Sequence, residues 1–120
     1  MKFAWVTLNV SDMKKSLDFY EGVVGLKTNR RMGPEKGREI VFLGFDDSST
    51  QVELICSQNV KPEHGQDLSL GFEVKSLAEK TEFLEKAGYK VDGPYQPAPH
   101  IKFSYVKDPD GVKIQFFENF

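Results

Sequence analysis

The 120-residue sequence has few of the residues that mark several common classes of protein. It contains one cysteine, Cys56, which excludes an internal disulfide framework and favours a reducing compartment. No apolar run approaches the ~20 residues of a membrane-spanning helix, and no secretory or transit segment is recognisable. We therefore expect a cytoplasmic protein without a membrane partner.

The sequence also lacks a strong excess of charge of either sign. Sixteen Lys and Arg residues are scattered among eighteen Asp and Glu residues, and the net charge is −2. This distribution contains no basic stripe, and the sequence has no zinc-finger or helix-turn-helix motif, so nucleic acid is not an expected partner. The length predicts a single domain, residues 1–120, large enough to bury a core without covalent cross-links.

Aromatic residues, in contrast, are abundant, with ten Phe in the chain. So many rings require either a large core or a pocket lined by rings. The stretch FAWVTLNV (3–10) predicts a strand with Ala4 and Leu8 on its apolar face. Phe3, Trp5 and Thr7 then lie on the opposite face. Two large aromatic side chains on one solvent-exposed strand face are rare, because water must then solvate their apolar area. We therefore expect this second face to line a ligand or another protein surface.

The rest of the first half is marked by helix caps and turn residues. A helix is expected to begin after Ser11 or Asp12 and to end at Gly25, which can adopt a left-handed conformation. The loop GPEKGR and the polar turn DDSST then separate three expected strands, at residues 26–32, 39–45 and 51–56. The predicted order is βαβββ over about residues 1–58.

The second half, about residues 66–120, repeats this order. A strand at 68–74 precedes a helix that Ser76 and Glu79 begin with a capping box and Gly88 ends. Three further strands are expected at YKVDG (89–93), IKFSYVK (101–107) and VKIQFFEN (112–119). The two halves also align in sequence at an offset of about 64 residues, which favours duplication.

The fold class that follows is α+β, with tandem βαβββ modules that form two curved mixed sheets. In each half the helix is expected to cover the apolar face of its sheet. The other two faces would then enclose a groove of mixed polar and aromatic character. Strand parity assigns the following residues to these faces: Phe3, Trp5, Thr7, Glu53, Ser69, Gly71, Glu73, Gln115 and Phe117.

The order of elements and three sequence stretches together resemble one known superfamily. The stretches are VTLNVSDMKKSLDFYEGVVGLK, VELI and DPDGVKIQFFE. They resemble the vicinal oxygen chelate superfamily, which includes glyoxalase I, bleomycin-resistance proteins and extradiol dioxygenases. The resemblance implies the glyoxalase/bleomycin resistance fold, and it also implies a homodimer. Whether the halves pair within one chain or across the dimer is left open. Because this superfamily hosts several chemistries, the function depends on the site.

The resemblance implies a divalent metal in the glyoxalase-like members, held by four strand positions. Here those positions carry Trp5, Glu53, Ser69 and Gln115. Only Glu53 offers a strong donor, because an indole N–H has no available lone pair and the hydroxyl and amide are neutral. We therefore expect no metal and no other cofactor, with Trp5 packing against an organic ligand instead. A relocated metal site at His64 or His100 remains an alternative.

The candidate ligand-binding residues are Trp5, Thr7, Glu53, Ser69, Gln115, Phe117 and His100. Trp5 is interpreted as a ring wall or, alternatively, as a core or dimer-interface aromatic. Glu53 is the candidate catalytic residue, a general base on a carbon acid, with structural hydrogen bonding as the alternative. Gln115 is expected to bond Glu53 or a ligand, and His100 follows PYQPAP as part of a lid.

Two classes of function are consistent with these residues. The first is a metal-free module of the bleomycin-resistance type that binds or sequesters a small organic molecule in an aromatic groove. The alternative is an enzyme resembling lactoylglutathione lyase or an epimerase, with a degenerate or reorganised metal site. A thiol-conjugate substrate is not favoured, because Asn9 and Ser57 stand where glutathione-dependent members place an Arg and an Asn.

Overall fold

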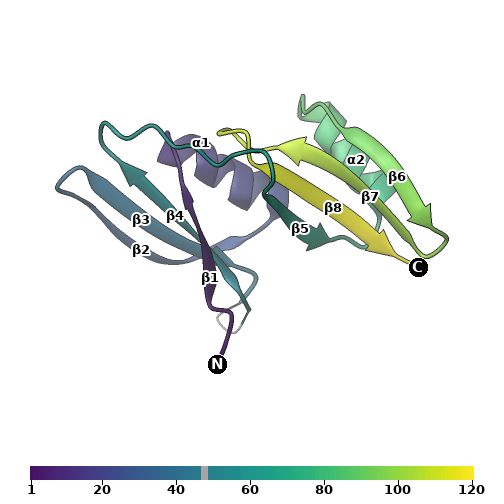
Figure 1. The fold of residues 1–120 in the computed structure, drawn as a ribbon, viewed down its shortest axis with the longest axis horizontal. Helices are drawn as coiled ribbons and strands as arrows, with labels where there is room; N and C mark the ends of the chain where they lie inside the picture. Colours follow the sequence, from purple (N-terminus) through teal and green to yellow (C-terminus); the bar gives the residue numbers. More distant parts are fainter. Residues whose placement is uncertain (47–48) are drawn as a thin grey trace. The chain divides into compact units, whose positions relative to one another are not determined.

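The computed structural model describes residues 1–46 and 49–120 (Figure 1). Contacts within the chain divide it into two compact units, Met1–His64 and Gly65–Phe120. Both units have the order βαβββ and one mixed four-stranded sheet, which confirms the predicted α+β class. That residues 1–120 act as a single domain, and that the two sheets enclose a groove, stay predictions. None of the described helices is long and apolar enough to cross a membrane.

The first unit contains a sheet in the order β1-β4-β3-β2 (Figure 1). β1 pairs with β4 in parallel, and the other neighbours are antiparallel. Leu8 and Val10 are buried, whereas Phe3 and Trp5 are exposed, so the predicted alternation along the first strand is present. The elements are β1 (Trp5–Asn9), α1 (Met13–Leu17), η1 (Asp18–Val24), β2 (Lys27–Glu35), β3 (Arg38–Gly44) and β4 (Gln51–Ser57).

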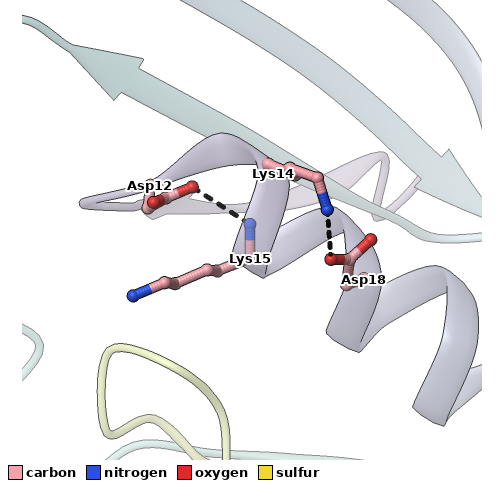
Figure 2. A network of polar contacts seen from close by, with 4 residues as sticks. All are labelled: Asp12, Lys14, Lys15 and Asp18. Carbon is pink, nitrogen blue, oxygen red and sulfur yellow. Dashed lines mark hydrogen bonds and ion pairs between the residues drawn. The ribbon is translucent and has the colours of Figure 1, made fainter.

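Asp12, one of the two predicted capping residues, begins the first helix. Its side chain accepts a hydrogen bond from the Lys15 backbone N–H at 3.1 Å, and Lys14 pairs with Asp18 one turn further on (Figure 2). These contacts fix the first turn of α1. Gly25 ends the helical segment with φ +92°, as the sequence predicts.

The prediction of one continuous α-helix was wrong for residues 18–24, which form a π-helix, η1. Four side chains of this segment are buried: Phe19, Tyr20, Val23 and Val24. A turn of 3.6 residues would also place positions i, i+1, i+4 and i+5 on one face of a helix, so their burial does not require the wider turn. The predicted buried face of the helix is therefore retained despite the change in helix type.

The loop predicted at GPEKGR is shorter in the structure than expected. β2 continues to Glu35, and β3 begins at Arg38. Only Lys36 and Gly37 form the turn, and both have positive φ, 53° and 75°. Two such residues are typical of the tight type I′ hairpin, whose twist matches that of the strands. In the other predicted turn, DDSST, residues 47 and 48 lie outside the described residues.

The second unit contains a sheet in the order β5-β8-β7-β6 (Figure 1). β5 pairs with β8 in parallel, and the other pairs are antiparallel. Ser76 Oγ accepts from the Glu79 backbone N–H at 3.1 Å, and Leu77 and Leu84 are buried. The elements are β5 (Ser69–Glu73), α2 (Leu77–Lys86), β6 (Asp92–Ala98), β7 (Ile101–Lys107) and β8 (Lys113–Asn119).

The strand predicted at residues 89–93 was misplaced, because β6 runs over Asp92–Ala98. This segment contains Pro94 and Pro97, which made it look like a loop in the sequence. β6 is an edge strand, so one side of its backbone has no partner strand. A proline whose nitrogen faces that side removes no hydrogen bond from the sheet, because proline has no backbone N–H. Edge position therefore explains how a proline-rich segment joins the sheet.

Candidate functional site

In the first unit, the predicted site residues Trp5, Thr7 and Glu53 share one face of the sheet. The parallel register places Thr7 directly opposite Glu53. The Thr7 hydroxyl donates a 2.5 Å hydrogen bond to Glu53 Oε1, and the Glu53 side chain is only 9% exposed. Within the described part of the chain, no Lys or Arg forms an ion pair with Glu53. Glu53 is therefore a largely buried carboxylate held by a neutral partner.

An aromatic wall adjoins this carboxylate. Trp5 meets the ring of Phe42 edge-on, with centroids 5.2 Å apart and planes at 76°. The Arg30 guanidinium lies 5.9 Å from the Phe42 centroid, and half of the Trp5 side chain is exposed. Together with Asn29 and Gln51, these residues line a shallow recess of about 340 Å³. A ligand in this recess could contact an aromatic ring, the Arg30 guanidinium and the side-chain amides of Asn29 and Gln51.

Phe42 is a site residue that sequence reasoning missed. It lies on β3 directly opposite Glu53 of β4, so it shares the face of Glu53. The run EIVFLGF is apolar at nearly every position, so alternation alone did not show which residues face the helix. The signal that identifies Phe42 is the register of β3 against β4, which the structure supplies.

In the second unit, Ser69, Gln115 and Phe117 lie on one face, with Ser69 exposed and the other two half-buried. Gln115 Nε2 donates to the Tyr105 hydroxyl at 3.2 Å, within its own sheet. Phe103 faces Phe117 across β7 and β8.

Tyr105 and Phe103 form a ring cluster with Tyr95 of β6, which sequence reasoning also missed. The Phe103 centroid lies 5.6 Å from that of Tyr95 and 5.5 Å from that of Tyr105. The Tyr95 hydroxyl donates to the Asp92 carboxylate, and this hydrogen bond raises the pKa of Tyr95 above its usual value. Misplacing β6 in the sequence concealed the third ring.

The two histidines lie in connections between strands. His100 is exposed in the turn between β6 and β7, and its carbonyl accepts from the Phe120 N–H at 2.9 Å. Its expected role in a lid stays a prediction. His64 Nε2 lies 2.7 Å from the Asn9 carbonyl oxygen, so that nitrogen carries the hydrogen. His64 thus ties the segment after β4 to the end of β1.

The residues at the four strand positions do not fit a transition-metal centre. The Trp5 indole nitrogen donates a hydrogen bond and has no free electron pair, whereas Ser69 and Gln115 supply neutral oxygens. Glu53, the one anionic donor, already receives the Thr7 hydroxyl on one oxygen. Among the described residues, no group of three or more His, Cys, Asp or Glu side chains is placed to hold a metal ion.

Comparison with known families matches this sequence and fold to one superfamily. The model of the Glyoxalase/Bleomycin resistance protein/Dioxygenase superfamily matches residues 2–116, nearly the whole chain. The chain belongs to this superfamily. The resemblance inferred from the three sequence stretches is therefore confirmed.

Relatives that align with nearly the whole chain include proteins that are named as enzymes. The chain is 32% identical to a lactoylglutathione lyase of Neisseria meningitidis, over 98% of this chain and 91% of that protein. It is also 32% identical to the lactoylglutathione lyase of Haemophilus influenzae, over 99% and 93%.

Solved structures extend the comparison. The trypanothione-dependent glyoxalase I of Leishmania major is 25% identical, with a TM-score of 0.85 over 98% of this chain and 86% of that chain. TnmS3, an antibiotic-binding protein of Streptomyces sp. CB03234, is 22% identical, with a TM-score of 0.79 over 100% and 97%. The second likeness shows the fold alone.

Proposed function

We propose that this superfamily member binds a small organic molecule with an aromatic part, and that the exposed Trp5 indole forms one wall of the site. The observation that carries the proposal is the edge-on pair of Trp5 and Phe42 beside a recess, at the strand position where glyoxalase-like relatives are expected to place a metal ligand. A ring that stacks on the indole gains about 1 kcal/mol beyond the burial of its area. Ser69, Gln115, Phe117 and His100, which belong to the second unit, are separately proposed as ligand-binding residues of that unit.

Glu53 gives this proposed site its polar selectivity. Thr7 holds Oε1, which leaves the second carboxylate oxygen to accept from an N–H or O–H group of the ligand. Because the side chain is largely buried, a ligand that lacks such a donor leaves a desolvated carboxylate without compensation. The proposed ligand therefore carries a hydrogen-bond donor near its ring.

A second candidate function is a lyase or epimerase reaction with Glu53 as general base. Identity of 32% to two lactoylglutathione lyases over more than nine-tenths of each protein supports it. The metal-dependent form of this reaction is not favoured, because Trp5, Ser69 and Gln115 are weak metal ligands. A glyoxalase assay with methylglyoxal and glutathione, with and without added Ni²⁺ or Zn²⁺, separates the two. If the protein turns over the substrate and Glu53→Gln abolishes this turnover, the enzymatic function is supported and the binding proposal is rejected.

The binding proposal is tested at Trp5 itself, because the chain has one tryptophan. Protein labelled with 5-fluorotryptophan gives a single ¹⁹F resonance, which is titrated with 2-naphthol and with the saturated analogue decahydro-2-naphthol. We expect a saturable shift with 2-naphthol and binding about fivefold weaker for the saturated compound, because only the aromatic ring can stack.

The matched variants are Phe42→Leu, which removes the ring beside Trp5, and Phe83→Leu, which removes an exposed ring on α2. Phe42→Leu is expected to weaken binding of 2-naphthol, and Phe83→Leu is expected to leave it unchanged. A ¹⁹F resonance that moves with neither compound, or equally with both, contradicts the role of Trp5 as a ring-stacking wall.

A further inference from the structure

Two lysines face each other at the end of the β7–β8 hairpin. Lys107 is the last residue of β7, Lys113 is the first of β8, and the register pairs them directly. Like charges at directly opposite positions of an antiparallel pair destabilise it. Within the described part of the chain, neither lysine forms an ion pair with a carboxylate. The fold thus tolerates a repulsive lysine pair that no carboxylate of the described residues neutralises.

The carboxylate nearest in sequence is committed to the turn. Asp108 is 5% exposed, and its Oδ1 accepts the backbone N–H groups of Asp110 and Val112, each at 2.9 Å. These bonds hold the hairpin closed and keep Lys107 and Lys113 at opposite positions. Asp108 therefore acts as a turn residue, and the geometry of the lysine pair is preset.

Both lysines line two neighbouring cavities of this unit. The larger, of about 520 Å³, also contains Lys90, Asp92 and Tyr105 in its wall. The smaller, of about 340 Å³, is lined by Lys107 and Lys113 with the segment around Gly65. Among the described residues that line the two cavities, Asp92 is the one carboxylate, and it already accepts the Tyr95 hydroxyl. The walls therefore carry an excess of positive charge, although the chain as a whole is negative.

Tyr105 adds an aromatic surface to the positive cavity. Lys113 Nζ lies 4.6 Å from the centroid of its ring. Because the Tyr105 oxygen accepts the Gln115 amide hydrogen, its own O–H remains able to donate. Three ammonium groups, a hydroxyl donor and a ring face are the groups that recognise an oxygen anion attached to a planar body.

We propose that the cavity walled by Lys90, Lys107 and Lys113 binds the oxyanionic group, phosphate or carboxylate, of a small organic molecule whose ring packs on Tyr105. The bound anion would neutralise the Lys107–Lys113 repulsion and draw both side chains together. This site lies within the second unit and does not depend on the proposed role of Trp5.

The test uses the whole chain with three probes: phenyl phosphate, inorganic phosphate and neutral phenol. Binding is followed by isothermal titration calorimetry and by the shifts of the Lys107, Lys113 and Gly111 amide resonances. We expect phenyl phosphate to bind most tightly and to weaken as salt is added, because its contacts are ionic. Benzoate in place of phenyl phosphate shows which oxyanion the site prefers.

The variants are Lys107→Gln and Lys113→Gln, with Lys75→Gln as the control, since Lys75 is an exposed lysine of the same unit outside both cavities. Each cavity variant is expected to weaken phenyl phosphate binding about tenfold, the value of one charge-assisted hydrogen bond. In phosphate-free buffer each is also expected to raise Tm, because it removes the repulsion. A structural role for the lysines predicts a lower Tm instead.

Three results would overturn this proposal. One is the absence of calorimetric heat and amide shifts with both phosphates. Another is a loss of affinity in Lys75→Gln equal to that in the two cavity variants. The third is equal affinity for inorganic and phenyl phosphate, which would remove the organic body and Tyr105 from the site. The ¹⁹F response of Trp5 to 2-naphthol is unaffected by any of these results, so the two proposals fail separately.

Discussion

At the scale of single residues, the hydrogen bond between Thr7 and Glu53 holds the candidate site carboxylate in place. The bond joins two strands that are distant in sequence, and among the described residues it is the one hydrogen bond to the Glu53 carboxylate, which is 9% exposed. Removing the donor leaves that carboxylate desolvated and unpaired, which costs more than the bond itself contributes. Thr7 is therefore a positioning residue whose effect depends on the charge of Glu53.

A double-mutant cycle measures this dependence. Thr7→Val is expected to lower the free energy of unfolding by about 1.5 kcal/mol in the native background and by about 0.5 kcal/mol in the Glu53→Gln background, where the acceptor is neutral. Thr28→Val, on the exposed strand β2, is the control and is expected to have little effect. The free energies of unfolding are measured by urea denaturation. Equal losses in both backgrounds would show that Thr7 contributes packing and no charge-dependent hydrogen bond.

A second residue-scale prediction concerns Lys80 of α2, whose ammonium lies 4.9 Å from the ring centroids of both Phe83 and Phe116. Burial lowers the pKa of Lys80 below its ordinary value of 10.5. The unfolded chain then binds this proton more tightly than the folded protein does, so the contribution of Lys80 to stability rises with pH between the lowered pKa and 10.5.

Lys80→Met isolates that contribution, because it keeps the apolar stem and removes the charge. The gain in the free energy of unfolding on Lys80→Met is expected to be larger at pH 7 than at pH 10.5, with Lys75→Met unaffected by pH. If the gain is the same at both pH values, the two rings compensate the ammonium fully and burial does not shift its titration.

At the scale of elements, the sequence predicted most strands and both helix starts, and its errors have physical causes. β7 was predicted with its observed bounds because alternation and the turn at 108–111 agree. β6 was misplaced because its two prolines are tolerated only at the edge of a sheet, and edge position is a tertiary property. The π-helix η1 was missed because helical periodicity assumes 3.6 residues per turn.

The cap of α2 provides the prediction at this scale. Ser76→Ala removes the oxygen that accepts the Glu79 N–H, and we expect the free energy of unfolding to fall by about 1 kcal/mol. Ser69→Ala, an exposed serine of β5 in the same unit, is the matched control. If Ser76→Ala loses no more stability than Ser69→Ala, measured by chemical denaturation, the cap does not contribute to the start of the helix.

At the scale of the whole molecule, the sequence predicted which residues share a face but not how the face is completed. Trp5, Thr7 and Glu53 were assigned together by strand parity, and the parallel register of β1 and β4 brings Thr7 and Glu53 into contact. The positions of Arg30 and Phe42 depend on strand register, and that of Tyr95 depends on the bounds of β6, which no pattern in one sequence fixes. Pairing between distant strands was therefore the missing information.

The proposed assembly belongs to the same scale. We expect a homodimer, so sedimentation equilibrium should give twice the 13.6 kDa chain mass at micromolar concentration. Exposed aromatic side chains, among them Phe3 and Phe45 at 68% and 55%, are available to be covered in such a dimer. A mass of one chain at every concentration tested would contradict this expectation.

The most direct test of the central claim is the binding of Ni²⁺ or Zn²⁺ to the purified protein, measured by equilibrium dialysis against Glu53→Gln. An indole, a hydroxyl and an amide in place of three strong donors predict no stoichiometric binding that depends on Glu53. We therefore expect the two proteins to retain equal, substoichiometric metal. One equivalent of metal held by the native chain and lost in Glu53→Gln would contradict the account and restore a metal-dependent site.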